Sequence, residues 1–166
     1  PPLHAGWAVR RKTNHFAAYE EVAKKFAKLL GMDPWLINPM FAKCGKVNFQ
    51  DGTGQECVQS DADALLGKIR RKYKEYGIQE KPFIIVKADA GTYGMGIMTV
   101  RDPKDLADLS RRTRNKMSVG KDGREVHEVI LQEGVPTYER VNDAVAEPVV
   151  YMIDRYVVGG FYRVNA

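Results

Sequence analysis

The spacing of apolar residues in the first half of the chain predicts two amphipathic helices. The first runs from His15 to Leu30, with Asn14 as its cap and Gly31 as its end. The second begins at Ser60 and ends at Gly77. The residues predicted on the two buried faces are Phe16, Tyr19, Ala23, Phe26, Ala27 and Leu30, followed by Ala62, Leu65, Leu66, Ile69 and Tyr73.

Residues 33–54, between the helices, contain prolines and several glycines and predict an irregular segment. Short strands are expected at 35–37 and 46–49.

The second half has the pattern of a sheet. A continuous apolar run at 83–86 predicts a buried strand, and 97–100 and 126–131 predict two further strands. A helix is predicted from Asp102, with Leu106, Leu109 and Met117 turned inward. A hairpin is predicted from 149–153 and 156–164, turning at Asp154, with a kink at Gly159. This order predicts an α+β fold with mixed or antiparallel sheets and flanking helices. We expect residues 1–80 to form a helical, linking subdomain and residues 81–166 a nucleotide-binding region.

Composition is that of a globular protein, with 44% hydrophobic and 28% charged residues in 166. No apolar run approaches the ~20 residues that span a bilayer, and the first residues do not form a secretory signal. We therefore expect a cytoplasmic protein without a membrane partner. Cys44 and Cys57 show no Cys-x-x-Cys spacing, so we expect two reduced thiols.

The net charge of +5 favours anionic partners, either a nucleoside triphosphate or nucleic acid. The densest basic patch, Arg111, Arg112, Arg114 and Lys116, is more typical of a solvated helix face. A non-catalytic nucleic-acid-binding module is the alternative function. It is disfavoured because no predicted strand interleaves basic and aromatic residues.

One segment combines a lysine with a glycine-rich loop. Lys87 ends a predicted buried strand, and Gly91, Gly94 and Gly96 lie in the loop before the next strand. Glycines let backbone N–H groups approach an anion, and a lysine adds a mobile positive charge. The spacing fits neither a Walker loop nor a dinucleotide fingerprint, because both of those lead into a helix. By itself, the pattern suits a phosphate loop and an ordinary hairpin equally.

Two further segments carry polar residues at strand ends. Gln132 and Glu133, with Val135 close behind, end a buried strand where adenine and ribose could bind. Arg163 and Asn165 lie on the last strand, where a cation could stabilise charge leaving a γ-phosphate. Taken singly, each segment is more typical of a solvated surface.

In this order, the three segments resemble the ATP-grasp superfamily, and more closely its proteobacterial glutamate–cysteine ligases. The residues that carry the closer resemblance are 1–7, 87–96 and 155–165. The resemblance implies an ATP-grasp-like fold, ATP and Mg²⁺ as cofactors, and a catalytic role for Arg163. The cofactor-binding residues that it implies are Lys87, Gly91, Tyr93, Gly94, Met95, Gly96, Gln132, Glu133, Val135 and Asn165.

The implied reaction joins the γ-carboxylate of glutamate to the amine of cysteine through an acyl phosphate, the first step of glutathione biosynthesis. Members of this family are much longer than 166 residues, and no acidic residue follows Asp154. We therefore expect the metal ligands to lie beyond this chain, which alone would be inactive. Lys43 and Lys46 are candidates for an additional phosphate-binding lysine. His4, His15 and His127 are too dispersed to predict a metal site.

Overall fold

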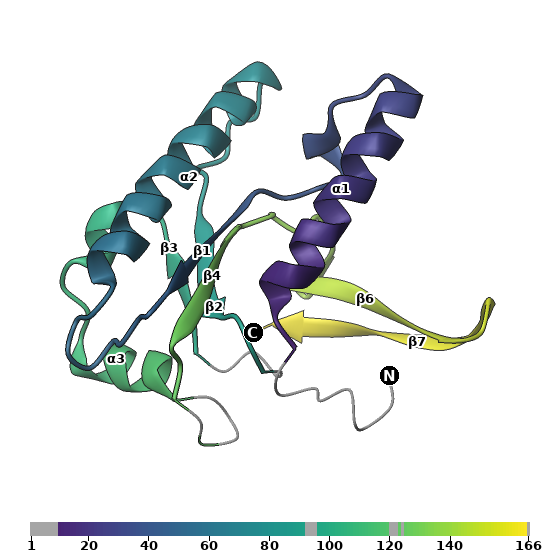
Figure 1. Ribbon diagram of the computed structural model, residues 1–166. Helices are drawn as coiled ribbons and strands as arrows, with labels where there is room; N and C mark the ends of the chain where they lie inside the picture. The colour runs from purple at the N-terminus through teal and green to yellow at the C-terminus, as the bar shows by residue number, and fades with distance from the viewer. Residues whose placement is uncertain (1–9, 92–95, 120–122, 124, 166) are drawn as a thin grey trace. The chain divides into compact units, whose positions relative to one another are not determined.

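The computed structural model describes residues 10–91, 96–119, 123 and 125–165. The chain divides into two compact units, Pro1–Gly134 and Val135–Ala166 (Figure 1). In order, the elements of the first unit are α1 (Lys12–Leu30), η3 (Pro34–Leu36), β1 (Phe41–Gly45), α2 (Gln55–Glu75), β2 (Ile84–Ala88), β3 (Ile97–Val100), η4 (Pro103–Leu106), α3 (Arg111–Ser118) and β4 (Glu128–Glu133). The second unit contains β5 (Arg140–Val141), β6 (Ala144–Ile153) and β7 (Tyr156–Asn165).

The first unit has a four-stranded sheet in the order β1-β4-β2-β3, in which every pairing is antiparallel. Helices α1 and α2 lie on opposite sides of this sheet (Figure 1). This arrangement confirms the predicted α+β class with antiparallel pairing. Because β1 pairs with β4, the part before residue 80 and the part after it share one sheet. The compact units divide between Gly134 and Val135, whereas our prediction placed a functional division near residue 80.

Both helices exist, but each begins earlier than its local sequence predicts. Helix α1 begins at Lys12, and a carboxylate from Asp89 takes the place of the predicted Asn14 cap. Helix α2 begins at Gln55 rather than Ser60, after Gly54 in a left-handed conformation (φ 75°). The first residue of α1 depends on a contact distant in sequence, and that of α2 depends on a glycine turn. The periodicity of apolar residues predicts neither.

The buried face of α2 agrees with the prediction, since all five predicted residues are buried and pack against the sheet. On α1, by contrast, Ala23 and Ala27 are buried while Phe26 is 50% and Leu30 58% exposed. The predicted apolar face of α1 is therefore only partly buried.

The irregular segment between the helices differs from the prediction. Strand β1 lies at Phe41–Gly45, and residues 35–37 instead form the end of the 3₁₀ helix η3 and its C-cap, Ile37. The Asp33 carboxylate caps this helix by accepting from the Trp35 N–H at 2.9 Å. Lys46, with a left-handed φ of 55°, ends β1, so the predicted strand at 46–49 is a turn with an isolated bridge at Asn48.

The helix predicted from Asp102 is two short helices. Asp102 forms a capping box that starts η4, and Ser110 caps α3 separately. Leu106, Leu109 and Met117 are all buried, as predicted.

The second unit is a hairpin extended by one short strand. Strands β6 and β7 turn at Asp154, whose φ is 54°, as predicted. The pairing shifts between Tyr151 and Met152, opposite Gly159, at the predicted kink. Most large apolar side chains of this hairpin are exposed. Among the described residues of the second unit, the buried hydrophobic residue is Ala146. None of the described helices is long and apolar enough to span a membrane.

Candidate functional site

One face of the four-stranded sheet carries polar side chains. Lys43 on β1 and Lys87 on β2 both pair with Ile130 on β4, so the three side chains point to the same side. Gln132 follows two residues after Ile130 and therefore shares this face. The alternate residues of these strands, such as Val86 and Leu131, point into the core beneath α2. We call the surface formed by Lys43, Lys87 and Gln132 the polar face.

Two of the predicted site residues meet on this face. The Lys87 ammonium donates a hydrogen bond of 2.6 Å to the side-chain oxygen of Gln132. Burial lowers the pKa of Lys87, and the nearby positive charge of Lys12 lowers it further. No carboxylate among the described residues forms an ion pair with Lys87. A half-buried cation in these surroundings would be stabilised by a bound anion.

The start of the glycine loop is held by the first turn of α1. Asp89 is fully buried, and its carboxylate accepts from the Thr13 backbone N–H and the Thr13 hydroxyl, each at 2.8 Å. The Lys12 ammonium donates to the backbone carbonyls of Ala88 at 2.7 Å, Ala90 at 3.2 Å and Gly91 at 3.0 Å. We call the contacts of Lys12 and Thr13 with residues 88–91 the loop clasp.

Lys12 and Thr13 are the residues that sequence reasoning missed. One signal could have found Lys12, because a cation in the first turn of a helix opposes the helix dipole and needs a local reason. Here the reason is the cluster of carbonyls at the loop. Burial lowers the pKa of Lys12, while the Asp89 charge acts in the opposite direction.

The predicted loop glycines lie partly within the described residues. Gly91 and Gly96 have φ of 84° and 65°, the left-handed region that favours glycine. Tyr93, Gly94 and Met95 lie outside the described residues.

Charged groups surround the polar face beside the clasp. The Lys43 ammonium lies 3.8 Å from Asp89 and 3.6 Å from Glu128, and Arg11 pairs with Glu128 at 2.6 Å. Of the two earlier lysines considered, Lys43 therefore reaches this region. Lys46 follows the end of β1 as an exposed turn residue.

Gln132 and Glu133 point to opposite faces of the sheet, because neighbouring strand residues alternate. The Glu133 carboxylate accepts hydrogen bonds from the Trp35 indole N–H at 3.0 Å and the Met40 backbone N–H at 2.9 Å. Burial raises its pKa. To bind a ribose, this carboxylate would have to break its hydrogen bonds to Trp35 and Met40. Val135 is exposed and begins the second unit.

Arg163 lies on β7 in the second unit. Its Nε donates to Glu147 Oε1 at 2.6 Å, directly across the hairpin. This exposed ion pair raises the pKa of Arg163 and lowers the pKa of Glu147. The backbone of Asn165 pairs with Val145 on β6.

The two cysteines are bonded to each other, so the expectation of two reduced thiols is wrong for this structure. The strand that carries Cys44 was not predicted, and without it the sequence separation gives no sign that Cys57 is a neighbour. Together with Asp61, they form the one group of three potential metal ligands among the described residues. No such group lies at the polar face within residues 10–91, 96–119, 123 and 125–165.

Comparison with known proteins agrees with the resemblance of the motifs. The family model of glutamate-cysteine ligase (GshA) matches residues 1–166. A search of curated proteins found no match. The crystal structure of a protein provisionally described as a gamma-glutamylcysteine synthetase, from Methylobacillus flagellatus KT, is similar with a TM-score of 0.86 and 63% identity. The match covers 99% of this chain and 39% of that protein, so this chain spans about two fifths of its length. Because the family model matches this chain from residue 1 to residue 166, the chain belongs to the glutamate-cysteine ligase family.

Proposed function

We propose that this chain forms the nucleotide-binding part of an ATP-dependent ligase that joins the γ-carboxylate of glutamate to the amine of cysteine in the cytoplasm. The observation that carries the proposal is the Lys87–Gln132 contact on a sheet face beside the clasped start of the glycine loop. A lysine that forms no ion pair with any described carboxylate, together with backbone N–H groups of a glycine loop, suits a polyphosphate. Family membership supports the choice of amino acids and of ATP.

The chemistry that we propose has two steps. A γ-carboxylate oxygen of glutamate attacks the γ-phosphorus of ATP, which forms an acyl phosphate and releases ADP. The cysteine amine then attacks the acyl carbon, loses a proton and expels phosphate. Such reactions depend mainly on positioning and on neutralising phosphate charge.

This chain's residues would act on the first step. Lys87 would neutralise charge on the phosphates, and the loop clasp would keep residues 88–91 in place before ATP arrives. Arg163 would leave Glu147 to meet the transferred phosphate, as the resemblance implies. We assign this arrangement to an ATP-grasp-like fold and retain Gln132, Glu133, Val135 and Asn165 as proposed nucleotide contacts.

Mg²⁺ would shield the phosphates in such a reaction. The described residues do not fit a protein-held Mg²⁺ at the polar face, because Asp89 is engaged by Thr13, and Glu128 by Arg11 and Lys43.

The test uses the full open reading frame that carries these residues. With ATP, Mg²⁺, glutamate and cysteine, ADP release should require both amino acids. When hydroxylamine replaces cysteine, it should trap the acyl phosphate as a glutamyl hydroxamate. ADP release that ignores either amino acid would contradict the substrate assignment, and absence of hydroxamate would contradict the acyl phosphate.

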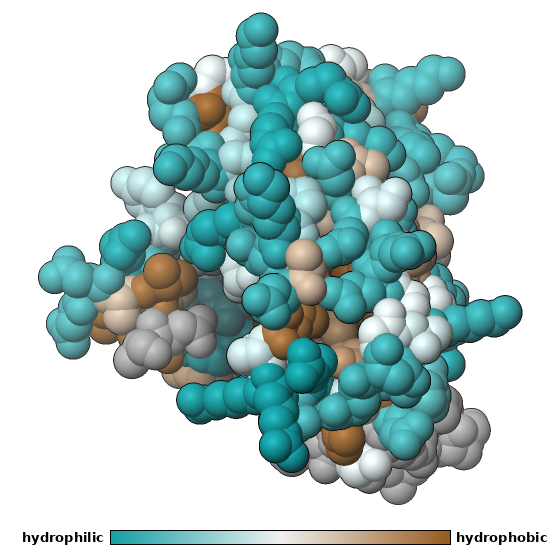
Figure 2. All heavy atoms as spheres, turned by 90° about the vertical axis from the view of Figure 1, so that its left-hand side faces the viewer, coloured by the Kyte–Doolittle hydropathy of each residue, from teal (hydrophilic) through white to brown (hydrophobic). Residues whose placement is uncertain are grey.

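The net charge of +5 keeps nucleic-acid binding as the second candidate function. The side of the first unit that carries α2 and α3 is largely hydrophilic, as expected for solvated helix faces (Figure 2). Within the basic patch, Arg114 donates to the Leu109 carbonyl at 2.8 Å, a contact inside the fold. A DNA or RNA affinity that falls steeply with salt would favour this candidate. Absence of binding to both DNA and RNA would dismiss it.

A further inference from the structure

We propose that Cys57 is a modification site for low-molecular-weight thiols, that Cys44 makes this modification reversible, and that Asp61 stabilises the opened state. The exchange chemistry depends only on the geometry around these three residues. Its connection to particular thiols rests on the proposed function, because cysteine and the dipeptide product would both carry a thiol.

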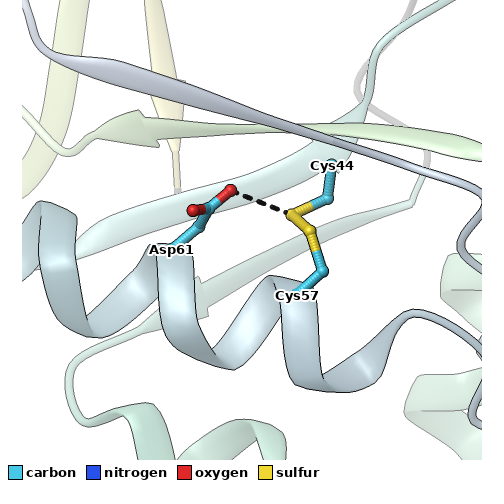
Figure 3. A group of neighbouring side chains, drawn as sticks. All are labelled: Cys44, Cys57 and Asp61. Atoms are coloured by element: carbon cyan, nitrogen blue, oxygen red, sulfur yellow. Dashed lines mark hydrogen bonds between the residues drawn. A yellow bond between two sulfur atoms is a disulfide. The ribbon is translucent and has the colours of Figure 1, made fainter.

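The two sulfurs join elements that face each other across the core. Cys44 lies on β1 with its side chain toward α2, and Cys57 lies in the first turn of α2 (Figure 3). Their Cα atoms are 6.3 Å apart, within the usual range for a disulfide. The bond therefore requires no rearrangement of the strand or the helix.

The two sulfurs differ in access. Cys44 is fully buried and belongs to the hydrophobic core, whereas Cys57 is exposed. A small thiolate can approach the Cys57 sulfur from solvent, while protein atoms cover Cys44. Because exchange depends on which sulfur can be reached, attack should occur at Cys57.

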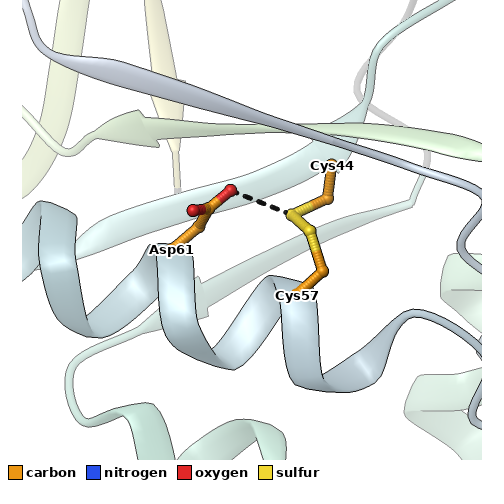
Figure 4. The surroundings of a disulfide bond; sticks show 3 residues. All are labelled: Cys44, Cys57 and Asp61. Atoms are coloured by element: carbon orange, nitrogen blue, oxygen red, sulfur yellow. Dashed lines mark hydrogen bonds between the residues drawn. A yellow bond between two sulfur atoms is a disulfide. The ribbon is translucent and has the colours of Figure 1, made fainter.

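Asp61 gives the opened state a partner. It lies one turn after Cys57 on the same face of α2, with Oδ2 3.1 Å from Cys44 Sγ (Figure 4). A bonded sulfur has no proton to donate, so this contact is a hydrogen bond only when Cys44 is a thiol. The same site can thus hold either a disulfide or a Cys44 thiol donating to a carboxylate.

Metal binding explains this cluster less well. The three ligand atoms lie within 4.8 Å of one another, but a structural zinc site requires four protein ligands. No fourth ligand joins the group among the described residues. A zinc ion would also have to separate two sulfurs that are bonded here.

The proposed exchange has two steps. A thiolate RS⁻ attacks Cys57 Sγ, the bond to Cys44 breaks, and Cys44 leaves as a thiolate that takes a proton from water. A second RS⁻ attacks the R sulfur of the mixed disulfide, which releases RSSR and leaves Cys57 as a thiolate. The net change converts the protein disulfide and two thiols into a protein dithiol and RSSR, and the reverse reaction consumes RSSR.

The location connects this chemistry to the candidate site. The bond ties α2 to β1, an edge strand whose Lys43 is on the polar face. Opening the bond removes a covalent link from the strand next to β4. The concentration of thiols would thereby determine whether β1, which carries Lys43 beside the proposed nucleotide site, is covalently linked to α2.

The test incubates the 166-residue chain in cysteine and cystine mixtures, followed by acid quenching, alkylation and peptide mass spectrometry. Cystine should give the Cys44–Cys57 disulfide, and intermediate mixtures should give cysteinylation at Cys57. In Cys44→Ser the Cys57 adduct should accumulate, whereas in Cys57→Ser the buried Cys44 should stay unmodified. Cysteinylation mainly at Cys44, or no internal disulfide in cystine, would overturn the proposal.

A second measurement isolates Asp61. The Asp61→Asn substitution removes a negative charge that opposes formation of the Cys44 thiolate, so ring closure from the Cys57 adduct should accelerate on the order of threefold to tenfold. Asp63→Asn, at an exposed position of the same helix, is the matched control and should leave the rate unchanged. Equal rates in the two variants would contradict the role of Asp61.

Both measurements omit ATP and glutamate. A failed exchange would therefore not contradict the proposed nucleotide site. Failure of ATP binding or of ligase activity would likewise not contradict the exchange chemistry.

Discussion

At the scale of single residues, Glu133 shows how burial changes a strand-end carboxylate. The sequence suggested a solvated or nucleotide-facing group, but the side chain accepts from Trp35 and Met40 inside the first unit. The strand prediction already implies that Gln132 and Glu133 point to opposite faces of the sheet. The sequence could not predict which of the two faces the core, because that depends on where α2 packs.

The raised pKa of Glu133 gives a pH prediction. A carboxyl group whose folded-state pKa exceeds its unfolded value stabilises the fold most when protonated, and this contribution is lost as pH rises. Relative to Glu133→Gln, the wild type should lose free energy of unfolding as pH rises from below about 4.5 through the raised pKa. Urea unfolding of both proteins across this range measures the difference, and a constant difference would contradict it.

At the scale of elements, β2, β3, β4 and the turn between β6 and β7 were predictable because apolar runs and a turn residue define them locally, whereas β5 and the first residues of β6 were not predicted. That a connection containing Gly91 and Gly96 joins β2 to β3 also followed from the local sequence. The loop clasp did not, because it joins residues more than 70 positions apart, and β1 did not, because its pairing with β4 is what makes it a strand.

The loop clasp can be tested with Thr13→Val, which removes the hydroxyl donor to buried Asp89 and keeps the side-chain shape. The free energy of unfolding should fall by about 1–3 kcal/mol, the usual cost of leaving a buried polar group short of a partner. Chemical denaturation measures this change. Thr99→Val, at an exposed position of β3, should change stability by less than about 0.5 kcal/mol. Similar losses in both variants would argue against the clasp.

The turn before α2 requires a glycine at position 54. Its φ is 75°, and a Cβ there would lie 2.8 Å from the backbone oxygen of Lys46, which cannot easily move. Gly54→Ala should cost about 2–4 kcal/mol in free energy of unfolding. Gly77→Ala, with φ 66° and nothing near its Cβ, should cost only about 1 kcal/mol. Equal costs in urea unfolding would show that the contact with Lys46 is unimportant.

At the scale of the whole molecule, the two compact units should differ in local stability. The first unit has a continuous core, whereas the second is a hairpin with mostly exposed apolar side chains. Small hairpin units are marginally stable by themselves. Amide hydrogen exchange should therefore be faster in β6 and β7 than in β2 and β4. Equal protection in all four strands would mean that the second unit gains stability from contacts other than its own.

The central claim is that Lys87 marks a phosphate site, and ATP titration of the chain by calorimetry tests it most directly. We predict that ATP binds the wild type and that Lys87→Met weakens its affinity at least about tenfold, because removing a charged partner costs about 1.5–3 kcal/mol. The control Lys81→Met, at an exposed position before β2, should bind like the wild type. Absence of ATP binding to the wild type, or equal affinity in Lys87→Met, would contradict the claim.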